Sequence, residues 1–261
     1  MNNVRNYNVC KNLILSDLLV FKKNLFDKFI NLTIWVVLTV FVMGYIMPYF
    51  GLPDSFGVFQ LGGILAAVAL FELYGSITEF VADLQGDRVI DYHLTLPIPS
   101  WLAIVSKAIY YFIIYLALSI MMLPIGKLTL WNQLDLAQIN YLKLFLALIF
   151  QSIFGACFTI WASTMIDNMS QMNNVWMRYI FPMWFMGGFQ FSWKSVYHVL
   201  PIVAWINLIN PMIYNTESVR VALLGQDDYL NFWLCIMAIS LFSVIFMTIG
   251  MSNLKKKLDY V

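Results

Sequence analysis

Long apolar stretches separated by short polar ones run along this chain of 261 residues. A helix needs roughly 20 mostly apolar residues to cross the hydrocarbon core of a bilayer, which is about 30 Å thick. The pattern therefore predicts an all-α integral membrane protein that forms one transmembrane domain over residues 1–261, with six spans. The expected spans are residues 29–47, 58–77, 101–123, 144–166, 175–191 and 229–251.

A further apolar segment, residues 199–214, is interrupted by two prolines and two asparagines. Its 16 residues are too short and too broken for an easy crossing. We expect an outer re-entrant or interfacial element over residues 199–225, since broken backbone is tolerated at membrane depth only where protein covers it or water reaches it. Asn210, directly before Pro211, is expected at the turn, where its side chain can cap exposed backbone donors.

The first 28 residues have a different pattern. Apolar side chains recur at intervals of four and three positions, at Ile14, Leu18, Phe21, Leu25 and Phe29. Lysines and aspartates occupy much of the remainder. This spacing predicts an amphipathic helix over residues 1–28, held in the cytoplasmic membrane interface by its apolar stripe and its lysines. A signalling or partner-binding role is the alternative.

The composition excludes a water-soluble globule, because 61% of the residues are hydrophobic and only 11% are charged. A soluble domain carries about 45–50% apolar and about 25% charged residues. The formal net charge of +1 also argues against a nucleic-acid-binding protein. Cys10, Cys157 and Cys235 lack a CxxC spacing and are expected as free thiols.

The distribution of Lys and Arg orients the chain, because short cytoplasmic loops hold the excess of these residues. Six spans place eleven Lys and Arg residues on the side of the two termini and four on the other side. Both termini are therefore expected in the cytoplasm. Lys194, His198 and Arg220 are expected outside, and His93 inside.

Motifs for catalysis and phosphate binding are missing from the sequence. It has no HExxH or GxSxG pattern, and its two histidines, His93 and His198, are expected on opposite sides of the membrane. The Gly126–Lys127 pair lacks the upstream glycine of a phosphate-binding loop and is followed by Leu128 rather than Ser or Thr. We therefore expect no metal site, no bound cofactor and no ATP hydrolysis by this chain alone.

The loop between the second and third expected spans, residues 79–100, is the most charged stretch of the chain. Its charged residues are Glu79, Asp83, Asp87, Arg88 and Asp91, and its apolar residues include Leu94 and Leu96. Gly86 interrupts the helical spacing, and Pro97 ends it. The pattern predicts a short cytoplasmic helix that contacts a partner. A solvated connector lying on the lipid headgroups is the alternative.

Four polar residues are expected at membrane depth or at its outer edge. Glu72 lies in the second span and Gln151 in the fourth, and both are possible pathway residues, because an intramembrane acid is a functional hypothesis by default. A protonated Glu72, or one bonded across the helix bundle, is the alternative. Glu217 precedes Arg220 by three residues, close enough for an ion pair on one helix face. That pair is a candidate outer gate, with structural capping as the alternative.

Several of these residues resemble motifs of the type-2 ABC transporter permeases. The coupling helix of that family is matched by Glu79, Gly86, Leu94, Leu96, Pro97 and Ile98, directly before the third span. The segment before the family's last span is matched by Asn210 and Pro211, followed by Glu217, Arg220 and Gly225. The sequence departs from the family at residues 83–88, which read Asp-Leu-Gln-Gly-Asp-Arg where the family has Arg, Glu and Gly-Thr.

The resemblance implies a permease subunit of an ABC exporter in a bacterial cytoplasmic membrane. It also implies a homodimer or heterodimer with a second permease, and a separate ATPase subunit that binds ATP and Mg²⁺ and docks on the coupling helix. Lipid-like, drug-like and lipid-linked substrates all fit. Two other classes stay open: a membrane-embedded lipid-modifying enzyme that uses Glu72, Asp83 or His93 as acid or base, and a membrane scaffold.

Overall fold

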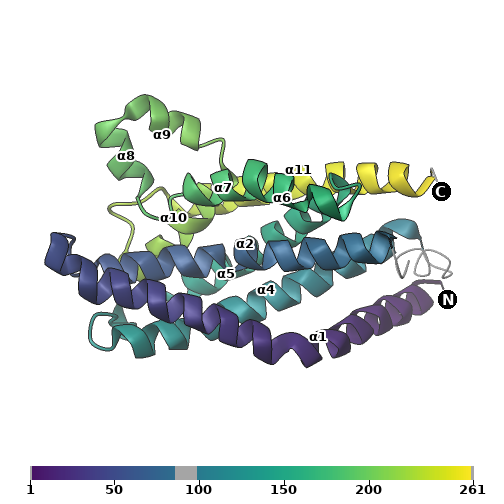
Figure 1. Cartoon of the computed structure of the whole chain (residues 1–261), viewed down its shortest axis with the longest axis horizontal. Coiled ribbons are helices and arrows are strands. Elements are labelled where there is room, and N and C mark those ends of the chain that lie inside the picture. The colour runs from purple at the N-terminus through teal and green to yellow at the C-terminus, as the bar shows by residue number, and fades with distance from the viewer. Residues whose placement is uncertain (1, 86–98, 260–261) are drawn as a thin grey trace.

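The computed structural model describes residues 2–85 and 99–259, and these residues form helices and connecting turns without a strand (Figure 1). The long helices are α1 (Asn2–Phe41), α2 (Phe56–Gln85), α4 (Ser100–Leu130), α5 (Tyr141–Thr164) and α11 (Phe232–Asp259). The short ones are α6 (Met172–Val175), α7 (Phe181–Phe185), α8 (Trp193–Val199), α9 (Pro201–Asn207) and α10 (Pro211–Leu224). Single π or 3₁₀ turns are η1 (Val42–Ile46), η2 (Met47–Phe50), η3 (Leu136–Gln138), η4 (Met169–Gln171) and η5 (Trp176–Ile180).

Five helical segments of the described chain are long and apolar enough to cross a membrane. They are Tyr7–Phe50, Phe56–Asp83, Trp101–Leu130, Tyr141–Thr164 and Phe232–Lys257. Each overlaps one of the expected spans. The chain is therefore an all-α membrane protein, as its hydropathy pattern predicts.

The amphipathic segment and the first expected span are one helix, although the sequence pattern placed a boundary at residue 28. Helix α1 continues through η1 and η2 as far as Phe50. The sequence has no glycine before Gly44 and no proline before Pro48, so no residue in this stretch breaks the helical hydrogen bonds. Figure 1 shows α1 changing direction along its length.

The expected span at residues 175–191 is a helical segment in pieces. Elements α6, η5 and α7 follow one another from Met172 to Phe185, which corresponds to about 21 Å of helix at 1.5 Å per residue. Gly188, with a φ of 76°, then turns the chain away in a conformation that favours glycine. The segment is shorter than the bilayer core, so a sixth full crossing stays a prediction.

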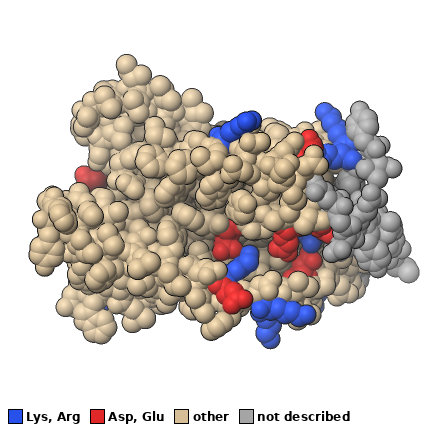
Figure 2. All heavy atoms as spheres, in the orientation of Figure 1, with Lys and Arg blue, Asp and Glu red and all other residues tan. Residues whose placement is uncertain are grey.

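The two termini lie at one end of the helix bundle, near the end of α2 and the start of α4 (Figure 1). Helices α8 and α9 project from the other end. We call these the terminal end and the hairpin end. Figure 2 shows the charged side chains of the drawn face gathered toward the terminal end, with little charge near the hairpin end. This arrangement agrees with termini that share one side of the membrane.

Helices α2 and α10 form the centre of the bundle. Helix α2 packs against α4, α5 and α10. Every residue of α10 from Pro211 to Leu223 is buried, including Glu217 and Arg220. Buried polar side chains are costly without hydrogen-bond partners, so the surroundings of α10 must supply such partners.

Helices α2, α4 and α5 approach closely at Gly155 of α5. A β-carbon at this position would lie 2.7 Å from Ala69 Cβ in α2 and 3.0 Å from Tyr115 Cδ2 in α4. Gly75 of α2 is different, because a β-carbon there would meet nothing within 4 Å. Small residues at such contacts let helix backbones approach each other in membranes.

Replacing Gly155 by Ala is expected to lower the thermal stability of the purified protein. The Ala69 β-carbon is fixed to its backbone, so the helices must separate, and overpacking of this kind costs about 1–3 kcal/mol. The matched control is Gly75→Ala, which should be neutral or stabilising because Ala favours a helix by about 1 kcal/mol over Gly. Thermal unfolding in detergent, followed by tryptophan fluorescence, measures both. Equal melting temperatures for the two variants would contradict the packing assignment.

Candidate functional site

Glu79 and Asp83, two of the expected ATPase-coupling residues, lie in the last turns of α2, at the terminal end (Figure 1). The Tyr110 hydroxyl of α4 donates a hydrogen bond to Glu79 Oε1 over 3.4 Å, and Asp83 also has an interaction partner. The other expected coupling residues lie outside the described residues: Gly86, Asp87, Arg88, Asp91, Leu94, Leu96, Pro97 and Ile98. His93 lies there as well. Helices α2 and α4 therefore lead into and out of the expected coupling segment and contact each other beside it.

The amino-terminal part of α1 is joined to the start of α4. Asp17 Oδ2 of α1 and Lys107 Nζ of α4 form an ion pair over 3.1 Å. Four residues before each partner of this ion pair, Leu13 of α1 and Ala103 of α4 form a small buried apolar cluster. Movement of the start of α4 would therefore act on α1.

The apolar stripe of α1 faces protein over much of its length. Phe21 is buried in the main core, and Leu18, Leu25 and Phe29 pack against that core. Leu19, Val20 and Phe26 are exposed instead. The stripe that the sequence periodicity singled out therefore packs against protein, and the exposed apolar residues lie outside it.

Glu72 is paired across the bundle. Lys28 Nζ of α1 donates to Glu72 Oε2 of α2 over 2.9 Å, and both side chains are largely buried. The ammonium group also lies 5.4 Å from the centre of the Phe21 ring. A carboxylate paired in this way has its charge balanced by protein, which matches the alternative of a bond across the bundle.

Gln151 joins three helices in the buried core. Its Nε2 donates to the Leu65 carbonyl of α2 over 2.8 Å and to the Ser119 hydroxyl of α4 over 3.0 Å. Its Oε1 is buried and has no hydrogen-bond partner among the described residues. The geometry assigns Gln151 a bridging role between α5, α2 and α4.

Arg220 is fully buried, and its guanidinium group donates to four main-chain carbonyls. Nε donates to the Phe59 carbonyl of α2 over 3.1 Å. Nη1 and Nη2 donate to the carbonyls of Gly188, Phe189 and Phe191, which belong to the loop between α7 and α8. Arg220 Cζ also lies 3.5 Å from the centre of the Phe59 ring, which adds a cation–π contact. Arg220 therefore holds a loop against the first turns of α2.

Glu217 performs a similar role for two other backbone segments. Its Oε1 accepts from the Trp193 amide at the start of α8 over 2.9 Å, and its Oε2 accepts from the Leu230 amide before α11 over 2.8 Å. Among the ion pairs of the described residues, none joins Glu217 to Arg220. The prediction of an ion pair between Glu217 and Arg220 is wrong, because each side chain bonds a different set of backbone groups.

Asn210 caps α10, as predicted from the Asn-Pro pair. Its Oδ1 accepts from the Met212 amide over 2.9 Å, and its Nδ2 donates to the Met183 carbonyl of α7 over 2.9 Å. Pro211 occupies the first turn of the helix, where its missing amide donor costs nothing. The break before α10 is thus bonded to α7.

The expected outer element divides into two parts. Helices α8 and α9 form a hairpin outside the bundle (Figure 1). The Trp205 ring of α9 meets Trp193 and Tyr197 of α8 edge to face, with centroids 5.9 and 6.2 Å apart, and Trp193 Nε1 donates to the Ala204 carbonyl. The hairpin exposes apolar side chains: Val199, Leu200, Ile202, Ile206 and Ile209. Helix α10 is the buried part. The polar side chains of α10 therefore bond to the interior, while several apolar side chains of the hairpin face outward.

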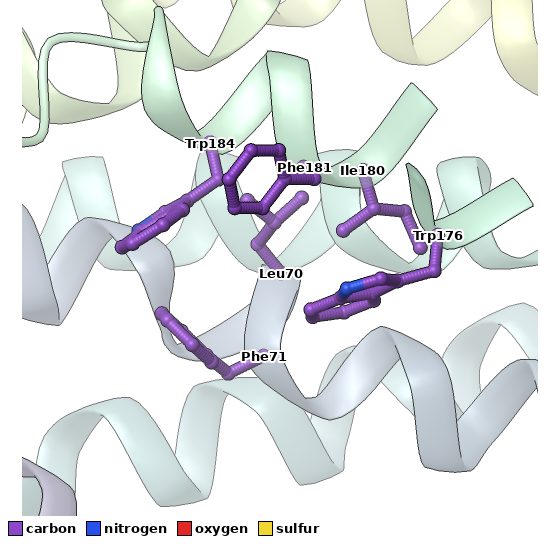
Figure 3. Close-up of a pocket in the computed structure, with 6 residues that line it drawn as sticks. All are labelled: Leu70, Phe71, Trp176, Ile180, Phe181 and Trp184. Carbon is purple, nitrogen blue, oxygen red and sulfur yellow. The ribbon is translucent and has the colours of Figure 1, made fainter. Parts of the chain in front are cut away.

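An apolar cavity of about 160 Å³ lies between α2 and the broken segment at residues 176–184. Figure 3 shows the residues that line it. Its lining is Leu70, Phe71, Trp176, Ile180, Phe181 and Trp184. The rings of Phe71 and Trp184 meet edge to face with centroids 5.7 Å apart. The sequence indicated this cavity only by a high aromatic content. Aromatic residues are also enriched at membrane interfaces, so that content does not predict a cavity. The cavity suits an apolar chain or ring.

A comparison with protein families complements this geometry. A family model described as ABC-2 type transporter matches residues 17–224. The matched region begins within α1 and ends at the last residue of α10, so it includes the expected coupling segment and the Arg220 site. The comparison with curated proteins gives no match.

Replacing Arg220 by Ala is expected to destabilise the folded protein by several kcal/mol. Four carbonyls lose their donor, and each buried polar group left unpaired costs about 1–3 kcal/mol. Thermal unfolding in detergent measures the change. The matched control is Arg178→Ala, which removes an exposed arginine and should leave the melting temperature near that of the wild type.

The same variant separates capping from gating. If Arg220→Ala keeps wild-type stability and dimer assembly while transport or leak through reconstituted protein changes, the capping role is wrong. If stability falls and activity per folded molecule is unchanged, gating by this residue is excluded.

Proposed function

The chain belongs to the ABC-2 type transporter family, and we propose that it is the permease subunit of a bacterial exporter driven by a separate ATPase subunit. The family match over residues 17–224 is the observation that carries this proposal. It covers most of the helices that are long enough to cross a membrane. In this scheme ATP and Mg²⁺ bind to the partner ATPase.

The transmission path of the proposal runs through the terminal end. In this scheme the last turns of α2, with Glu79 and Asp83, and the segment that follows, with Asp87, contact the ATPase. The bond from Tyr110 to Glu79 and the ion pair of Lys107 with Asp17 support this path, because they link the flanks of the segment to α4 and α1. A displacement of the segment would reach three helices together.

The substrate in this proposal is lipid-like, drug-like or lipid-linked. The support is the apolar cavity between α2 and residues 176–184, whose lining carries no charged side chain (Figure 3). Such a lining favours an apolar ligand and offers little to a free ion or a bare sugar. Two permeases, either two copies of this chain or this chain with a second permease, would form the complete pathway.

The pairing of Glu72 argues against one of the three residues, Glu72, Asp83 and His93, that a lipid-modifying enzyme would use as acid or base. A general acid or base must be free to exchange its proton with a substrate. Glu72 is instead engaged by Lys28 at 2.9 Å. We therefore assign Glu72 a structural role in the permease.

Affinity purification of the full chain in mild detergent tests the function. An ATPase subunit with a phosphate-binding loop is expected to copurify, and Asp87→Lys should reduce its recovery, because the variant reverses a charge in the proposed docking segment. The matched control is Asp54→Lys, which makes the same change in the α1–α2 loop and should retain the partner. Absence of any ATPase from the wild-type complex, or equal recovery with Asp87→Lys, would count against the proposal.

Cysteine labelling in intact cells tests the orientation, with both termini in the cytoplasm of a cell whose inner membrane holds the protein. The background carries Cys10→Ser, Cys157→Ala and Cys235→Ala. A membrane-impermeant maleimide should label His198→Cys on α8 and fail to label Lys23→Cys on α1, both of which are exposed positions. The reverse pattern would overturn the orientation.

A further inference from the structure

A second cavity, of about 550 Å³, opens at the hairpin end. Its walls come from three segments that are distant in the sequence: residues 52–59 before and within α2, residues 190–198 around the start of α8, and residues 224–229 before α11. Both polar and apolar side chains line it, in contrast to the cavity of Figure 3. This cavity is distinct from the proposed substrate site and from the coupling segment.

Two side chains of α10 bond the segments that form the walls of this cavity. Arg220 bonds the carbonyls of Phe59 and Phe191, and both of these residues line the cavity. Glu217 bonds the amides of Trp193 and Leu230, each of which is next to a lining residue. The cavity is therefore preorganised, which lowers the entropy lost when a ligand binds.

Opposite charges line the cavity without neutralising each other. Lys194 and Asp228 are both lining residues. Lys194 Nζ donates to the Asp227 carbonyl, and no ion pair joins Lys194 to Asp228 in the part of the chain that the structure describes. A cation on one wall segment and an anion on another are complementary to a ligand that carries both charges.

Other lining residues fit the two halves of such a ligand. His198 lies one turn after Lys194 on α8 and can donate to the same anionic group. The Phe59 ring already contacts Arg220 and stacks on Phe56, with ring centroids 5.2 Å apart, so Phe56 is the lining ring that offers an aromatic face to an ammonium group.

An apolar surface begins directly beside the cavity. Val199 and Leu200 follow His198 in the chain and are 75% and 56% exposed, and Ile202 of α9 is 76% exposed. Acyl chains attached to a bound headgroup could lie along this edge of the hairpin. A soluble ligand would gain nothing from it.

We propose that this cavity binds the zwitterionic headgroup of a membrane phospholipid, with the phosphate at Lys194 and His198 and the ammonium group at Asp228. The site depends on the hairpin end reaching a lipid leaflet, and it does not depend on which substrate is transported. Its test measures binding alone, so its failure is distinguishable from failure of the transporter function.

The experiment titrates the full chain, in a nonionic detergent, with short-chain phospholipids and counts bound lipid by native mass spectrometry. The probes are dihexanoyl phosphatidylethanolamine and dihexanoyl phosphatidylglycerol, which share the phosphate and differ in the ammonium group. The wild type is expected to prefer the ethanolamine lipid by about fivefold, the scale of partly solvated charge pairs. Asp228→Asn should abolish that preference, and Lys194→Gln should weaken binding of both lipids about fivefold.

Two matched variants control for general charge effects. Asp227→Asn makes the same change at the neighbouring residue, whose main-chain carbonyl bonds Lys194 but whose side chain does not line the cavity. Lys143→Gln removes a lysine of α5 that does not line the cavity either. Both should bind like the wild type.

Three results would overturn the proposal. One is equal binding of the two lipids by the wild type, and another is the same loss of preference in Asp227→Asn as in Asp228→Asn. The third is binding of soluble glycerophosphoethanolamine as tight as that of the phospholipid, which would identify a free metabolite headgroup as the ligand. Melting temperatures within the wild-type range show that the variants are folded, as expected for the exposed Asp228.

Discussion

The buried guanidinium group of Arg220 is the constraint on which the hairpin end of the bundle depends. A charge at such a position is expensive unless polar groups surround it. Here four main-chain carbonyls provide that environment, and three of the bonds satisfy carbonyls of the loop at residues 188–191. The arginine and the loop therefore need each other. Glu217 likewise accepts hydrogen bonds from two amides. The short helix α10 therefore bonds both carbonyls and amides of irregular backbone.

The terminal end uses a different principle, in which side chains pair with side chains. Lys28 with Glu72 and Asp17 with Lys107 connect α1 to α2 and α4. For largely buried pairs of this kind the cost of removing both charges from water offsets much of their attraction, but the pairs fix which helix faces meet. The two ends therefore differ: bonds to backbone hold α10 in place, whereas pairs of side chains join α1 to α2 and α4.

The sequence predicted the parts of this fold that depend on local composition. Long apolar stretches and the Asn210–Pro211 cap follow from the length and residue types of one segment. The continuity of α1 across residue 28 was hidden by a change of periodicity that does not interrupt a helix. The partners of Arg220 were beyond reach, because Phe59 lies 161 positions away and offers a carbonyl, which every residue has. The aromatic cavity likewise depends on tertiary packing of Phe71 against Trp184.

The polarity of α10 also constrains how the protein is made. A 14-residue helix that carries Glu217 and Arg220 has little affinity for lipid, since a charged residue costs about 2.5–3.5 kcal/mol at the centre of an inserting helix. It must enter a bundle whose carbonyls are already in place, and one of them belongs to Phe59. The Arg220 site is therefore complete only when the start of α2 lies beside α10. A segment synthesised early supplies a bond to a charged side chain synthesised late.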